Sequence, residues 1–108
     1  MQIHTDNTQY QQIIQGCLVF LKAFDTQLYS MCIQAIEELG VTDKAFIVVD
    51  GSSVYLPEAL FANVVTEHII YQLLVALRSR GVVAQSEIDQ FVRSTRVTPY
   101  VWDLELGQ

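Results

Sequence analysis

The sequence predicts an α+β fold dominated by helices, with three to four helices, one β-hairpin and a candidate C-terminal strand. Apolar residues recur at helical spacing in several segments. In residues 45–56, β-branched runs flank Asp50-Gly51, as in a hairpin. Residues 102–106 alternate apolar and acidic, which is typical of a half-buried strand. A chain of 108 residues has the length of one domain, so we expect residues 1–108 to share one core.

The first helical pattern covers residues 9–24, where Thr8 and Gln11 have the spacing of a capping box. Asp25 then has the chemistry to cap a second helix, which ends just before Gly40. The pattern leaves open whether residues 9–39 form one long helix or two that meet at Asp25.

The hairpin signal lies in residues 45–56. A two-residue turn at Asp50-Gly51 predicts that Phe46 and Tyr55 face each other across the two strands. Because two strands alone are marginally stable, we expect the C-terminal strand to complete a small sheet, either in its own subunit or in a neighbouring one.

The third helical pattern runs over residues 58–80, between Pro57 and Gly81. Its apolar residues cover almost the whole circumference of the predicted helix. A helix that is apolar all round must be buried all round. We therefore expect it to be the central helix, an interface helix, or both. A fourth, short helix begins with Ser86 as its cap and turns Ile88 inward.

Composition indicates that this chain shares surface with a partner. Apolar residues make up 51% of the chain and charged residues only 17%, which is little charge to cover a small monomer. We therefore expect a homodimer. The net charge of −6 suits a basic protein partner and argues against nucleic acid.

The start of the chain lacks a basic leader pattern, and its longest charge-free stretch is too short to span a bilayer, so we expect a cytoplasmic protein without membrane contact.

The two cysteines, Cys17 and Cys32, lie in apolar surroundings without a CxxC spacing, so we interpret them as buried thiols. The sequence leaves open whether they are close together, and a redox role is the alternative. A metal site is not expected, because Glu67-His68 lacks the second histidine of an HExxH motif and His4 lies near a terminus that we expect to be loose. No cofactor motif is present in the sequence.

Glu67 and His68 are the main candidate site residues, because they interrupt the most apolar helix. As neighbours they point about 100° apart, so they do not act together on one atom. His68 and Gln72 share a helix face at i,i+4. They form either a polar strip on the wall of a pocket, beside Tyr71, or a hydrogen-bonded pair that sets the register of an interface.

Four arginines, Arg78, Arg80, Arg93 and Arg96, form the basic cluster of the sequence. If the third and fourth helices pack in antiparallel fashion, these side chains converge on a carboxylate or phosphate. The alternative is that they are solvated charges at helix ends.

Tyr100 and Trp102 complete the set of candidate binding residues, because Tyr and Trp are enriched at interface hot spots. They dock either on their own core or on a partner.

Together these observations favour a small acidic, non-enzymatic protein–protein interaction module (an inhibitor, immunity-type factor, adaptor or chaperone-like protein) that acts as a homodimer. The first alternative is a ligand-binding domain or enzyme with a pocket beside residues 58–80. The second is a nucleic-acid-associated regulator that uses the arginines.

Overall fold

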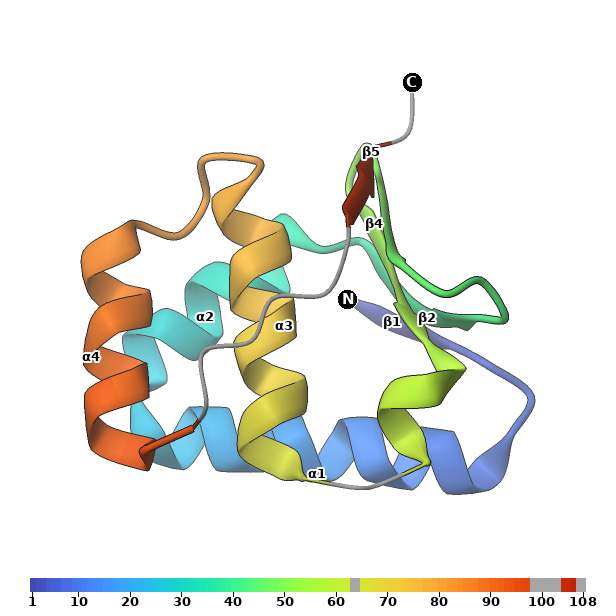
Figure 1. Cartoon of the computed structure of the whole chain (residues 1–108), viewed down its shortest axis with the longest axis horizontal. Helices are drawn as coiled ribbons and strands as arrows, with labels where there is room; N and C mark the ends of the chain where they lie inside the picture. The colour runs from blue at the N-terminus through green and yellow to red at the C-terminus, as the bar shows by residue number, and fades with distance from the viewer. Residues whose placement is uncertain (63–64, 98–103, 107–108) are drawn as a thin grey trace.

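The computed structural model of the chain describes residues 1–62, 65–97 and 104–106, and it confirms the predicted helix-dominated α+β fold. Figure 1 shows α2, α3 and α4 on one side of a sheet, with α1 running beneath them. The elements follow the order β1 (Gln2–His4), α1 (Thr8–Phe24), α2 (Thr26–Ala35), β2 (Glu38–Thr42), β3 (Ile47–Asp50), β4 (Ser53–Pro57), the 3₁₀ helix η1 (Glu58–Phe61), α3 (Thr66–Arg78), α4 (Gln85–Thr95) and β5 (Leu104–Leu106).

The five strands form one sheet in the order β1-β2-β4-β3-β5. Strands β1, β2 and β4 are parallel to one another, and β3 and β5 run in the opposite direction. The C-terminal strand therefore completes the sheet of its own chain, which was one of the two predicted outcomes. The N-terminus is not loose as expected, because residues 2–4 pair with β2 as an edge strand.

Two separate helices, α1 and α2, fill the region that the sequence left open. Asp25 separates them with an extended backbone, and its carboxylate accepts the N–H of Leu28 at 3.0 Å. Helix α1 has nearly the predicted bounds, but its cap is not Thr8. The side chain of Asn7 accepts the N–H of Tyr10 at 3.1 Å, so the predicted capping box is wrong by one residue.

The second helix ends earlier than predicted, at Ala35, and residues 38–42 form β2 instead of its last turn. Gly40 accordingly lies in the middle of a strand and does not cap a helix. Strand β2 pairs with β1 on one side and β4 on the other, which satisfies its backbone groups along both edges. Leu39 is buried in the core from the strand, so tertiary pairing outweighs the local helical spacing.

The hairpin of β3 and β4 forms where predicted, but its turn lies one residue later, at Gly51 and Ser52. Tyr55 therefore pairs with Val48, and the predicted pairing with Phe46 is wrong. Of the two turn residues only Gly51 has a positive φ, at +58°. This is the type II′ arrangement, in which glycine takes the first loop position.

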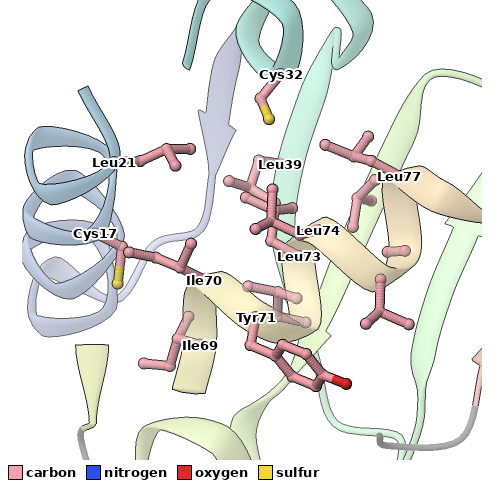
Figure 2. Close-up of a cluster of buried hydrophobic side chains, with 14 of the residues drawn as sticks. Cys17, Leu21, Cys32, Leu39, Ile69, Ile70, Tyr71, Leu73, Leu74 and Leu77 are labelled. Carbon is pink, nitrogen blue, oxygen red and sulfur yellow. The ribbon is translucent and has the colours of Figure 1, made fainter. Parts of the chain in front are cut away.

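Helix α3 occupies the centre of the molecule. All nine residues from 69 to 77 are buried, so the prediction of burial on every side is confirmed. In Figure 2, Ile70 points toward α1 beside Cys17, Leu74 lies near Leu39 of β2, and Tyr71 points away from α1. The chain's own elements thus cover the helix that the sequence left as a candidate interface.

The α-helix is shorter than the predicted 58–80, because η1 covers residues 58–61 and α3 starts only at Thr66. Val65 has an extended backbone, with φ −120° and ψ 104°. β-Branched residues such as Val65 and Thr66 have reduced helix propensity, which favours a break here. The predicted cap of the fourth helix is also wrong, since Ser86 lies inside α4, whereas Ile88 is buried as predicted.

Candidate functional site

The predicted site residues lie mainly along the groove between α3 and α4, which run in opposite directions (Figure 1). Two hollows lie in this groove. The first has a volume of about 330 Å³, at the start of α3 and the end of α4. The second has a volume of about 300 Å³ and lies farther along the same two helices. The residues that line the first are Val65, Glu67, His68, Thr95, Arg96 and Val97.

The first hollow gathers charged groups of both signs from two helices. Glu67 and His68 are partly buried, and Arg96, which is exposed, takes a left-handed backbone (φ 58°) where α4 ends. The hydroxyl of Thr95 donates a hydrogen bond to the backbone carbonyl of Phe91 at 2.7 Å. The hydroxyl at this hollow is thus engaged within α4, and the remaining groups suit binding better than nucleophilic chemistry.

The predicted contact between His68 and Gln72 is present, with 3.4 Å between their Nε2 atoms. Gln72 is completely buried, and the chain that buries it is its own, as for the rest of α3. The pair therefore lies inside the packing of the central helix, where it satisfies polar groups that would otherwise be costly to bury. The sequence had placed it across a subunit interface or on a pocket wall, and only His68 lines a hollow.

The second hollow lies beside Tyr71, which the sequence placed beside a predicted pocket. The side chain of Tyr71 is only 5% exposed. Two of the hollow's polar residues, Gln85 and Asp89, are joined by a hydrogen bond. Gln85 accepts a hydrogen bond from Arg78 and donates one to Asp89 at 2.9 Å. Arg93 lines the same hollow from α4.

The four arginines do not converge. Arg78 contacts the first residue of α4, Arg93 lies at the second hollow, and Arg96 lies at the first, beside the opposite end of α3. Arg80 is exposed just beyond the end of α3. An eleven-residue helix spans about 16 Å, so these charges are spread along α4 and form no single phosphate clamp. The antiparallel packing of α3 and α4, on which this prediction depended, is present, but the four arginine side chains do not meet at one point.

Both cysteines are buried free thiols, as predicted. Burial raises the pKa of Cys17 to about 11, with a smaller contribution from the carboxylate of Glu67. Burial likewise raises the pKa of Cys32 to about 12, with a smaller contribution from Glu87. Because the thiolate is the reactive form, both groups are inert near neutral pH. Within the described ranges, no three His, Cys, Asp or Glu side chains are grouped so that they could hold a metal ion.

A further surface was not predicted from the sequence: the face of the sheet that points away from the buried core. We call this surface the outer face. Side chains alternate along each strand, and the register aligns Leu39, Val54 and Val49 in one buried row. The positions between them form the outer face, on which most side chains stay partly or fully exposed: Gln2, His4, Glu38, Gly40, Thr42, Val48, Asp50, Ser53 and Tyr55.

The centre of the outer face is flat and largely apolar. One row across the strands consists of His4, Gly40, Tyr55 and Val48. A Cβ atom on Gly40 would lie 2.7 Å from Cδ1 of Tyr55 and 2.9 Å from its Cε1, so the ring lies directly against the glycine. Glycine is required here because any side chain would displace the ring.

The outer face was not predicted, because the local patterns of its residues favoured other structures. Gly40 was predicted as a helix terminator and Tyr55 was paired with Phe46. The alternation of Glu38, Leu39, Gly40 and Val41 is the signal that would have indicated a strand.

Two predicted binding residues, Tyr100 and Trp102, lie outside the described residues. Across the helices that the structure describes, none combines the length and apolar character needed to cross a membrane. Comparison of the chain with models of protein families, with curated proteins and with solved structures finds no match in any of the three.

Proposed function

We propose that this chain is a small, non-enzymatic protein–protein interaction module that docks a partner on the outer face. The observation that carries this proposal is the one-sided cover of the sheet. The buried row of Leu39, Val54 and Val49 packs into the core, whereas Tyr55 and Val48 on the other side remain partly exposed. A flat, partly apolar face bordered by polar residues is the anatomy of a binding surface.

The homodimer was expected from the sequence for two reasons, and the structure supports them unequally. The low charge content still favours shared surface. The apolar circumference of α3 does not, because residues 69–77 are buried by the chain itself. We therefore treat a second copy as one of the partners that the experiment must distinguish.

The proposal is tested by capture of binding proteins from the native host, with the pure protein as bait. Tyr55→Lys and Val48→Lys place a charge in the apolar row of the outer face. Val19→Lys adds the same charge on α1, where the side chain is 69% exposed, and serves as the matched control. We expect the wild type and Val19→Lys to retain the same binding proteins and both outer-face variants to lose them.

Melting curves and circular dichroism show whether each variant remains folded. Two outer-face variants are used because the ring of Tyr55 also packs on Gly40, so its loss costs some stability. A binding protein that all three folded variants retain equally contradicts docking on the outer face, and a mass measurement on the wild type shows directly whether a second copy binds.

A second candidate function is a small ligand-binding domain that uses the first hollow. Its specific support is that the structure brings Glu67, His68 and Arg96 around one cavity of about 330 Å³. If this is the function, a compound from a metabolite panel raises the melting temperature of the wild type. His68→Ala should abolish the shift, whereas Gln90→Ala, an exposed change on α4, should preserve it. A panel that shifts neither protein removes this candidate.

A further inference from the structure

The distribution of charge indicates what kind of partner the outer face would accept. Residues 1–62 contain two Lys and seven Asp or Glu, and they include four of the five strands. Residues 65–97, which form α3 and α4, contain four Arg and three Asp or Glu. Residues 1–62 therefore carry a net charge of −5, to which Glu38 and Asp50 in the strands contribute, and residues 65–97 carry a net charge of +1.

Acidic residues border the apolar row of the outer face. The register places Glu38 and Asp50 in the adjacent row, on either side of Ser53. Two residues along a strand span about 6.7 Å, so these carboxylates lie one side-chain length from the row that contains Tyr55 and Val48. At the same end, the exposed Glu37 accepts a hydrogen bond from Ser52.

The two basic groups near this face are already engaged. The Nδ1 atom of His4 lies 3.3 Å from a carboxylate oxygen of Glu38. The ammonium of Lys44 lies 5.6 Å from the ring centre of Phe46, beyond the far end of the strands. A partner that brings positive charge to the row of Glu38 and Asp50 is attracted by these carboxylates, whereas an acidic partner is repelled.

The size of the outer face also bears on the partner. The five strands lie about 4.8 Å apart and are three to five residues long, so the face measures at most about 24 by 16 Å, or about 400 Å². A stable interface between two globular proteins buries about 800 Å² per partner. A second copy stacked on this face would bury at most about 400 Å² per copy, which is less than this usual area.

We propose that the outer face binds a cationic amphipathic helix of a partner protein. This inference rests on the proposed function and names the chemistry of its partner. A helix of about three to four turns spans the 16–24 Å of the face. Its apolar side covers Tyr55 and Val48, and its Lys or Arg residues lie over Glu38 and Asp50.

The test uses the full chain and two labelled synthetic peptides of about four turns, measured by fluorescence anisotropy. One is an amphipathic Lys/Leu helix and the other has every Lys replaced by Glu. We expect the Lys/Leu peptide to bind, with an affinity that falls as salt is added, and the Glu/Leu peptide not to bind. Glu38→Gln with Asp50→Asn should weaken binding roughly threefold to tenfold, because each exposed ion pair contributes modestly. Tyr55→Lys should abolish it.

The control is Asp6→Asn with Glu58→Gln, which removes the same two charges at exposed positions outside the strands and should leave binding unchanged. Equal weakening by both double variants means that bulk charge attracts the peptide and overturns the inference. Failure of the Lys/Leu peptide, while a host protein is still lost on Tyr55→Lys, also overturns the inference but leaves the proposed function intact. A dimer that dissociates on Tyr55→Lys identifies a second copy as the occupant and overturns it as well.

Discussion

Helices α1 and α3 pack against each other in one core, yet they relate to solvent in opposite ways. Helix α3 is enclosed, with every residue from 69 to 77 buried. Helix α1 has one buried side, which includes Cys17 and Leu21, and one open side, which includes Gly16 and Val19. Both helices are rich in apolar residues, so composition alone does not distinguish an enclosed helix from an exposed one.

The difference teaches where the spare apolar surface of this chain lies. From the sequence, the apolar residues around α3 were predicted to be available to a partner. In the structure, the sheet, α1 and α4 cover these residues. The large apolar side chains that are exposed are those of Met1, Val19 on the open side of α1 and Val65 just before α3. On the outer face, Tyr55 and Val48 are partly exposed. The position of an element in the fold therefore decides whether its apolar residues stabilise the core or remain available to a partner.

The largest effect that separates the two helices is expected from a cavity in α3. Leu74 is 0% exposed, so Leu74→Ala should lower the free energy of unfolding by about 2–5 kcal/mol. Val19→Ala on the open side of α1 should change it by less than about 0.5 kcal/mol. Urea denaturation of both variants measures the two values. Similar losses at both positions would show that α1 is as enclosed as α3.

The next effect concerns pH and the buried thiols, one of which, Cys17, is on the closed side of α1. Below the ordinary pKa of 9.0 both folded and unfolded chains keep their thiols protonated. Above it the unfolded thiols ionise, whereas the folded ones keep their protons until about pH 11 for Cys17 and about 12 for Cys32. Stability should therefore be complete below pH 9 and fall as the pH rises from there, by at most about 1.4 kcal/mol per pH unit for each thiol.

The measurement is a series of denaturation curves from pH 8 to 11, with Cys17→Ala/Cys32→Ala as the comparison. The double variant should have a lower stability at every pH, because it creates cavities, but a shallower dependence on pH. Equal slopes in the two proteins would mean that the thiols ionise alike in the folded and unfolded states.

Much of the fold follows from the sequence because its helices repeat apolar residues at a local spacing. The cap residue Asp25 predicts the break between α1 and α2, and apolar residues on all sides of one helical stretch predict the burial of residues 69–77. Both agree with the structure or with one of the predicted alternatives. The strand around Gly40 was not predicted. The local spacing of residues 38–42 resembles a helix, but hydrogen bonds to β1 and β4, which are distant in the sequence, make this segment a strand. Local pattern carries no information about such pairing.

The candidate sites were harder to predict for the same reason. The i,i+4 contact of His68 and Gln72 is local and was found. The grouping of Arg96 with Glu67 depends on how α4 lies against α3, and the sequence placed Arg96 with the other arginines instead. The outer face depends on strand register, and a shift of one residue in the hairpin turn was enough to hide it.

A smaller effect is expected at the junction between the two helices. Asp25 caps α2 through Leu28 while its own N–H ends α1 on the carbonyl of Leu21. Asp25→Ala should lower the free energy of unfolding by about 1 kcal/mol, as is usual for a lost cap. Asp25→Asn should retain most of this contribution, because its side chain still offers an accepting oxygen. If Asn and Ala are equally destabilising by thermal denaturation, the charge of Asp25 and not its cap is responsible.

The smallest effect is also the most direct test of the open side of α1. A Cβ atom on Gly16 would meet nothing within 4 Å, and its φ is not positive. Alanine loses less backbone entropy than glycine when it joins a helix, so Gly16→Ala should raise the free energy of unfolding by about 0.5–1 kcal/mol. Gly51→Ala, at a φ of +58°, should lower it instead, since alanine is strained there. Urea denaturation gives both signs. If Gly16→Ala destabilises the protein, another surface packs closely on α1 at this position, and the contrast between an open α1 and an enclosed α3 no longer holds.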